Sequence, residues 1–155
     1  KGKRQFTEVY VSTPAEASAC EAAGIDMIVT SEGNDVKAIR AAAPNVFFTI
    51  GFLANSVYAT ADDAVRCGFK ALSNGADAVY AGVSLKSVEA MANEAIPVVG
   101  HVGFIPYKSS WFGGFKAVGK TAEVALKLYK RTLAYQEAGA IGVEMEIVPY
   151  QIASE

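Results

Sequence analysis

The sequence predicts an α/β barrel, a curved sheet of parallel strands with helices on its outer side, and three observations support it. Six apolar segments rich in β-branched and aromatic residues alternate with helical segments. These strands are continuously apolar, as expected for a parallel sheet that is buried on both faces. The βα units repeat about every 25 residues, and no GxGxxG motif follows the first strand, which favours a (β/α)8 barrel over a dinucleotide-binding sheet.

Local signals place each element in order. The first strand ends before Thr13 and Pro14, where Thr13 caps the first helix and Pro14 takes its first position. Thr60 caps a later helix with Asp62 and Asp63 in its first turn, where carboxylates suit the helix dipole. The expected strands are residues 6–12, 26–32, 46–52, 77–83, 97–104 and 141–149. The expected helices are residues 13–24, 35–44, 60–76, 84–95 and 121–140.

Three phrases, AAGIDMIV, SNGADAVY and EAGAIGVE, share one pattern, in which a helix ends on Ala and Gly and a strand begins after a small residue. This repetition supports a chain of similar βα units. About six units are present, so we expect residues 1–155 to form a single, partial βα-barrel domain.

Composition excludes several classes of partner. The 155 residues carry a net charge of −2 with a pI near 5.5, which leaves no basic surface for nucleic acid or for an anionic membrane. No apolar run approaches the roughly 20 residues of a membrane span, and no targeting segment is recognisable. Cys20 and Cys67 are expected to be free thiols, as in a cytoplasmic protein. The expected partner is a small molecule or a second copy of the chain.

Side chains of a strand alternate between the barrel interior and the helix-packed face, so polar strand residues can be assigned to a face by counting in twos. If the polar face is the interior, several polar side chains meet at the carboxyl ends of neighbouring strands, where such barrels carry their active sites. These residues are Glu32, Thr49, Tyr80, His101 and Glu146.

Each candidate also has a structural explanation. A purely structural role is hardest to defend for Glu146. An ionised carboxylate between apolar neighbours must be paired with a cation, bind a metal or have a raised pKa. His101 also fits a hydrogen-bonded core residue, and Thr49 and Tyr80 fit packing as well as ligand contact. Glu144 fits a salt bridge at the barrel floor. Lys116 lies in a Gly- and aromatic-rich loop, residues 111–116, that suits either a hydrophobic plug or a lid over an acidic ligand.

Four segments resemble one family. GHVGFIPYKSSWFGGFKAVGK (100–120) is similar to the GHxGxxPQ…GGYKVQGK segment of ketopantoate hydroxymethyltransferases, and AGAIGVEMEIVP (138–149) to their stretch that ends in LECVP. AAAPNVFFTI and AGIDMIVTSEG resemble the family's RGAPN segment and the strand before its GDS motif. The resemblance implies a (β/α)8 TIM barrel of the phosphoenolpyruvate/pyruvate-like superfamily, in a homo-oligomer. It also implies transfer of a hydroxymethyl group from 5,10-methylenetetrahydrofolate to 3-methyl-2-oxobutanoate in pantothenate biosynthesis, with Mg2+ holding the 2-oxo acid.

Carried over residue by residue, the resemblance makes Glu146 the general base and His101 an active-site histidine. Glu32 falls on the metal-binding Asp of the GDS motif. Gly51 and Gly82 fall on the other acidic metal positions, where glycine offers no ligand, and Tyr80 replaces a lysine. Glu32, Tyr80, Thr49 and Lys116 are therefore the expected substrate-binding residues, with Glu32 as the metal ligand.

The sequence supports four hypotheses. The first is a hydroxymethyltransferase-like enzyme acting on a small 2-oxo acid. The second is a related oxo-acid C–C lyase or mutase. The third, which the glycines at metal positions favour, is a catalytically inactive paralogue that binds a ligand or a partner. The fourth, which the absent βα units favour, is a barrel fragment without activity of its own.

Overall fold

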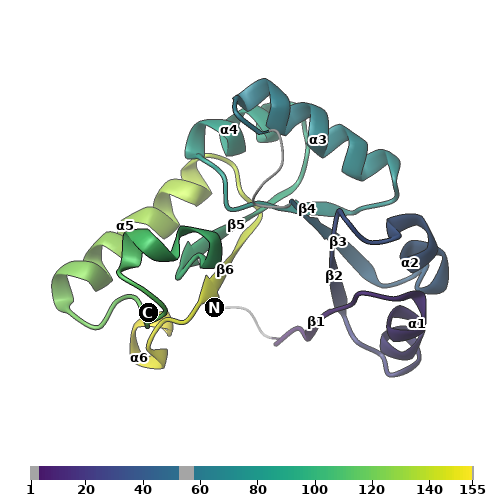
Figure 1. The fold of residues 1–155 in the computed structure, drawn as a ribbon, viewed down its shortest axis with the longest axis horizontal. Coiled ribbons are helices and arrows are strands. Elements are labelled where there is room, and N and C mark those ends of the chain that lie inside the picture. The colour runs from purple at the N-terminus through teal and green to yellow at the C-terminus, as the bar shows by residue number, and fades with distance from the viewer. Residues whose placement is uncertain (1–3, 53–57, 155) are drawn as a thin grey trace.

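Six parallel strands pair in sequence order and curl into an arc, and the helices cover the convex side of that arc (Figure 1). This architecture comes from a computed structural model that describes residues 4–52 and 58–154. The strands are β1 (Glu8–Tyr10), β2 (Met27–Ser31), β3 (Phe47–Gly51), β4 (Ala78–Tyr80), β5 (Val98–Gly103) and β6 (Gly142–Glu146). The helices are α1 (Pro14–Ala22), α2 (Val36–Ala42), α3 (Ala61–Ser73), α4 (Leu85–Asn93), the 3-10 helix η1 (Pro106–Phe112), α5 (Ala122–Glu137) and α6 (Tyr150–Ala153).

The predicted partial α/β barrel is confirmed by this arrangement. β1 and β6 are the two ends of the arc, so its concave side lies open between them (Figure 1). The paired segments are shorter than the sequence suggested, because the residues that flank each strand run into caps and turns. The extent of the domain, residues 1–155, stays a prediction.

The helix starts are those that the sequence predicts. Thr13 and Thr60 each form a capping box, with Glu16 and Asp63 respectively, in which the side chains satisfy backbone N–H groups reciprocally. Thr121 caps α5 through its hydroxyl, which accepts from Val124 N.

The helix ends share one turn, which explains the repeated phrases in the sequence. After α1, α3 and α5 a glycine with positive φ follows the C-cap, at Gly24, Gly75 and Gly139. In each turn the next N–H donates to the carbonyl five residues before it, as Ile25 N does to Cys20 O at 3.0 Å. This is the Schellman motif. α4 makes the same turn with Ala95 at φ +57, an unfavourable position for a residue with a Cβ.

Packing separates the two faces of the sheet. Ile28, Phe48, Val79 and Val98 are fully buried in the layer between strands and helices. Val99, next to Val98, lines the concave face instead. The predicted assignment of side chains to the two faces of β4, β5 and β6 is confirmed. Val79, Val102 and Val143 pack in the helix layer. Tyr80, His101 and Glu146 line a cavity on the concave face.

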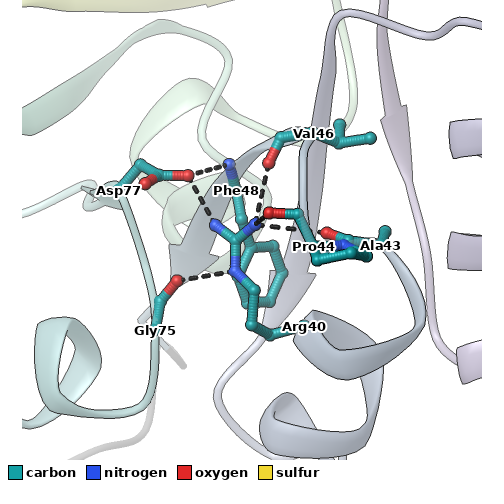
Figure 2. A network of polar contacts seen from close by, with 7 residues as sticks. All are labelled: Arg40, Ala43, Pro44, Val46, Phe48, Gly75 and Asp77. Atoms are coloured by element: carbon teal, nitrogen blue, oxygen red, sulfur yellow. Dashed lines mark hydrogen bonds and ion pairs between the residues drawn. The ribbon is translucent and has the colours of Figure 1, made fainter.

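A guanidinium network joins α2 to the amino ends of β3 and β4 (Figure 2). Arg40 Nε donates to Gly75 O at 2.8 Å, and its Nη2 pairs with Asp77 Oδ2 at 2.5 Å. Its Nη1 donates to three carbonyl oxygens, those of Ala43 (3.2 Å), Pro44 (3.2 Å) and Val46 (2.9 Å). Asp77 also accepts from Phe48 N at 2.8 Å, and the guanidinium lies 4.9 Å from the centre of the Phe48 ring. Arg40 therefore satisfies polar groups that the turns leave without partners.

One further expectation is met by the two cysteines. Cys20 and Cys67 are free thiols. None of the helices traced in residues 4–52 and 58–154 combines the length and the apolar character that a membrane crossing requires.

Candidate active site

A cavity of about 470 Å3 opens on the concave face at the carboxyl ends of the strands. Parallel barrels place their chemistry at this end, because the loops that follow the strands can vary without disturbing the sheet. Its polar lining includes Ser31 of β2, Tyr80 of β4, His101 of β5 and the two glutamates of β6, and aromatic rings enclose it. The lining includes Tyr10, Phe52, Tyr80, His101, Tyr107 and Glu146.

His101 lies at the centre of the polar contacts and is only 5% exposed. Its Nδ1 is 2.6 Å from the Tyr80 hydroxyl. Its Nε2 is 3.0 Å from the carbonyl oxygen of Phe104 and 3.0 Å from Oε2 of Glu146. The imidazole is thus held on both sides, between β4 on one hand and the loop after β5 with the end of β6 on the other.

Glu146 is the last residue of β6, with its side chain 25% exposed. Phe104 N donates to the Glu146 carbonyl at 2.8 Å and so fixes the strand end beside β5. The next residue, Ile147, has φ +47, which is rare for a β-branched side chain. The carbonyl of Ile147 accepts from Val118 N at 3.0 Å, so the loop before α5 holds this turn in place.

Tyr80 stands between this cavity and a second one of about 500 Å3 toward the amino ends of the strands, and it lines both. Burial raises the pKa of Tyr80, and the neighbouring Glu144 and Glu146 carboxylates raise it further. The hydroxyl therefore keeps its proton and acts as a hydrogen-bond donor.

Glu144 lies on the same face of β6 as Glu146 and is exposed in the open concave side. Glu8 is exposed at its end of β1, but partial desolvation by neighbouring protein atoms and the charge of Glu144 raise its pKa. The salt bridge expected for Glu144 is not formed, since no ion pair of Glu144 is found in the described part of the chain.

The structure does not bring Glu32 to this cavity. It follows β2 on the helix side, in a small pocket with Val36, Cys67 and Lys70, and accepts a hydrogen bond from the Tyr58 hydroxyl. The predicted alternation along β2 is correct, because Glu32 lies on the same side of the sheet as Ile28 and Thr30. The assumption that the face is interior was wrong, because both side chains are fully buried in the helix layer.

Thr49 and Lys116 also lie elsewhere than predicted. Thr49 faces the amino-end cavity rather than the carboxyl-end one, and it is 1% exposed. Lys116 is exposed on the loop beside Gly113 and does not line the cavity of His101. The expected contact of Lys116 with a ligand therefore has no support from this arrangement.

Sequence reasoning missed Tyr107 and Lys108, which follow Pro106 in the loop after β5. The Tyr107 hydroxyl donates to Gly82 O at 2.6 Å, and Lys108 Nζ donates to the same oxygen at 3.1 Å. Burial lowers the pKa of Lys108, and the charge of Arg131 lowers it further. Their position directly after the histidine strand was the available signal.

Of the three positions expected to hold magnesium, two are glycines and the third, Glu32, does not line this cavity. Mg2+ prefers one or two carboxylates with water and substrate oxygens in octahedral geometry. In residues 4–52 and 58–154 no group of three or more His, Cys, Asp or Glu side chains is placed to share a metal ion. A Cβ at Gly82 would lie 2.7 Å from the Tyr107 hydroxyl, and one at Gly51 would lie 3.4 Å from the Tyr80 ring. Tyrosines thus occupy the space above both glycines.

Comparison with known proteins adds independent findings. The family model for ketopantoate hydroxymethyltransferase matches residues 32–155. The 3-methyl-2-oxobutanoate hydroxymethyltransferase of Thermus thermophilus is 34% identical over 179 aligned residues, which cover the whole of this chain and 68% of that enzyme. The enzyme of the same name numbered 1 in Methylibium petroleiphilum is 32% identical and is covered to 58% of its length.

Two solved structures have a similar fold. 2,3-Dimethylmalate lyase, a member of the PEP mutase/isocitrate lyase superfamily, matches 92% of this chain and 56% of its own with a TM-score of 0.63 and 14% identity. Phosphonopyruvate hydrolase, solved with oxalate and Mg2+, matches 92% of this chain and 59% of its own with a TM-score of 0.65 and 15% identity. At these identities the likeness concerns the fold alone.

Proposed function

Because this chain belongs to the ketopantoate hydroxymethyltransferase family, we propose that its carboxyl-end cavity binds a small 2-oxo acid and that Glu146 is the general base. The substrate we propose is 3-methyl-2-oxobutanoate, with 5,10-methylenetetrahydrofolate as the one-carbon donor. The family's curated enzymes carry this substrate in their names. The chain spans about two thirds of those enzymes or less, so the activity of the whole protein is part of the proposal.

One observation carries the proposal, the contact between Glu146 and His101 in the cavity wall. A carboxylate that removes a proton next to a ketone must be held in place and within reach of the substrate. Oε2 of Glu146 is 3.0 Å from His101 Nε2, and the same side chain lines a cavity of about 470 Å3. That volume suits a ligand as small as 3-methyl-2-oxobutanoate.

The chemistry follows from the substrate. Glu146 takes the single proton from C3 of the oxo acid, and the electron pair of the broken C–H bond forms an enolate. Water hydrolyses the methylene bridge of 5,10-methylenetetrahydrofolate, so that both of its C–N bonds break and formaldehyde and tetrahydrofolate form. C3 of the enolate then bonds to the formaldehyde carbon, the electron pair of the C=O bond becomes an alkoxide, and the alkoxide takes the proton back from Glu146 to give the hydroxyl group. His101 has the positioning role, since its ring fixes the carboxylate that accepts the proton. No step is assigned to Mg2+.

Proton removal can be tested without folate. In D2O, a working base exchanges the C3 proton of 3-methyl-2-oxobutanoate for deuterium, and one-dimensional 1H NMR follows the loss of the C3 signal. We expect exchange with the intact protein well above the buffer rate, and a hydroxymethylated product when 5,10-methylenetetrahydrofolate is added. Absence of exchange over a wide range of protein concentration would contradict the assignment of Glu146 as base.

A second candidate function is a ligand-binding paralogue without catalysis. The observation that favours it is the pair of tyrosines above Gly51 and Gly82, which leaves no acidic metal ligand there. Calorimetric titration with 3-methyl-2-oxobutanoate, with and without Mg2+, separates the two. Binding without C3 exchange indicates the paralogue, whereas binding with exchange indicates the enzyme.

A further inference from the structure

The contacts of His101 assign a role to Tyr80 that the family resemblance does not suggest. We infer that Tyr80 is the positioning residue for His101, and that its hydroxyl donates to Nδ1 and thereby fixes the imidazole with Nε2–H directed at Glu146. Only the kinetic consequence of this inference rests on the proposed function. The hydrogen bond itself can be tested on the protein without any substrate.

The donor and acceptor types around the ring lead to this role. The two partners of Nε2, the Phe104 carbonyl at 3.0 Å and the Glu146 carboxylate at 3.0 Å, are both acceptors. Nε2 must therefore carry a proton. In the neutral imidazole Nδ1 is then an acceptor and needs a donor, which the Tyr80 hydroxyl supplies at 2.6 Å.

Tyr80 is suited to be that donor. It belongs to β4, whose residues pair with β3 and β5, so the backbone position of the ring is set by the sheet. The ring packs above Gly51 and is tilted 33° to the imidazole, with 5.4 Å between ring centres. Burial and the adjacent carboxylates keep the hydroxyl protonated. The Tyr80 hydroxyl is also within hydrogen-bond reach of Glu144. Because Glu144 is exposed, water can satisfy that carboxylate, whereas Tyr80 is the only donor to Nδ1 in the described part of the chain.

Loss of the hydroxyl has a defined consequence. In Tyr80→Phe the ring can keep its packing, but Nδ1 loses its only donor in the described part of the chain. The imidazole is then held at Nε2 alone and can rotate away from Glu146. The base loses a fixed orientation, while the cavity keeps its shape.

The test uses the single histidine of this chain. With 15N-labelled histidine, the two imidazole resonances belong to His101 without assignment, and each reports whether its nitrogen carries a proton or accepts a hydrogen bond. At alkaline pH we expect a protonated Nε2 and an Nδ1 signal displaced from that of a free acceptor nitrogen. Tyr80→Phe should move the Nδ1 signal to the free-acceptor position, and Tyr129→Phe, an exposed tyrosine of α5, should leave it unchanged.

Either of two results would overturn the inference. One is a protonated Nδ1 in the unmodified protein at alkaline pH, which is decisive even if the variant does not fold. The other is a folded Tyr80→Phe protein, verified by circular dichroism, with an unchanged Nδ1 signal.

Kinetics then separate this inference from the proposed function. We expect Tyr80→Phe to lower kcat for C3 exchange about tenfold with KM changed less than about twofold, since second-layer partners of a catalytic group have effects of roughly this size. If the intact protein shows no exchange while the Nδ1 signal responds as expected, the proposed function fails and the inference stands. If exchange occurs but Nδ1 does not respond, the inference fails and the proposed function stands.

Discussion

At the amino end of the sheet Arg40 places its guanidinium nitrogens on four carbonyl oxygens and one carboxylate (Figure 2), whereas at the carboxyl end His101 and Glu146 meet beside a cavity of about 470 Å3. Both regions join neighbouring strands through charged or polar side chains. At the amino end the polar groups are fully occupied by one another. In the second the contacts leave room for a ligand.

This difference predicts which substitutions affect the stability of the protein and which affect its activity. A saturated network raises the free energy of unfolding and has no further effect. An open network lowers the free energy of unfolding, because some of its partly buried polar groups lack hydrogen-bond partners. Such a network can, however, move a proton. We therefore expect stability and activity to respond to separate sets of substitutions.

Glu146→Gln should have the largest effect, at the carboxyl end. The amide keeps the shape of the side chain but cannot take a proton, so C3 exchange should fall roughly a thousandfold, within the range for loss of a general base. The melting temperature should change by only a few degrees. Glu89→Gln, on the exposed side of α4, is the control and should exchange normally. Exchange by Glu146→Gln at the original rate would place the base elsewhere.

Arg40→Ala should be the largest change at the amino end. It leaves Asp77 and several turn carbonyls without their donor, and we expect the free energy of unfolding to fall by about 3 kcal/mol, as for a broken, partly buried ion pair. Urea unfolding followed by circular dichroism measures this. Arg66→Ala removes an exposed pair with Asp63 and should cost less than about 0.5 kcal/mol. An equal decrease in the free energy of unfolding of the two variants would mean that the Arg40 network stabilises the fold no more than an exposed ion pair.

Thr49→Val tests the strand region between the two ends. Thr49 Oγ1 is buried and has no hydrogen-bond partner in the described part of the structure, so replacing the hydroxyl with a methyl group should raise the free energy of unfolding by about 1 kcal/mol. Thr30→Val is the matched control on β2, because Thr30 Oγ1 donates to Val11 O at 2.7 Å, and it should destabilise by a similar amount. A loss in both variants would show that Thr49 has a partner in solution.

Ala95→Gly should have the smallest effect. Ala95 is exposed and holds φ +57 in the turn after α4, so glycine should stabilise the protein by about 0.5–1 kcal/mol without loss of packing. Gly24→Ala makes the reverse change at φ +73, with open space around the added methyl group, and should destabilise by a similar amount. Thermal unfolding of both variants gives the sign. C3 exchange should stay unchanged in both, because these turns lie away from the cavity.

The elements of the fold could be predicted from the sequence because their signals are local. Thr13 and Thr60 cap helices wherever they precede one, and the Ala-Gly turns end helices at the same place in each unit. The assignment of His101 and Glu146 to one cavity also followed, since a glutamate and a histidine stand out among apolar strand neighbours.

The positions of Glu32, Thr49 and Lys116 could not be predicted in the same way. Each face of β2 carries apolar residues and one polar residue, so its sequence does not say which face packs against the helices. The hydrogen bond of Thr30 to Val11 O hides a polar residue in the helix layer. The depth of Thr49 depends on the register between β2, β3 and β4. The place of Lys116 depends on how its loop folds over the strand ends, which no periodicity describes.

The turn at Ile147 has a mechanical consequence for the base. A β-branched residue in the left-handed region costs roughly 1–2 kcal/mol, and this turn lies directly after Glu146 and is tied to the loop before α5 by the bond from Val118 N. The strained turn therefore connects the loop before α5 to the strand end that carries Glu146. Displacement of the loop at Val118 would break the hydrogen bond to Ile147 O and leave the strained turn beside Glu146 without that restraint.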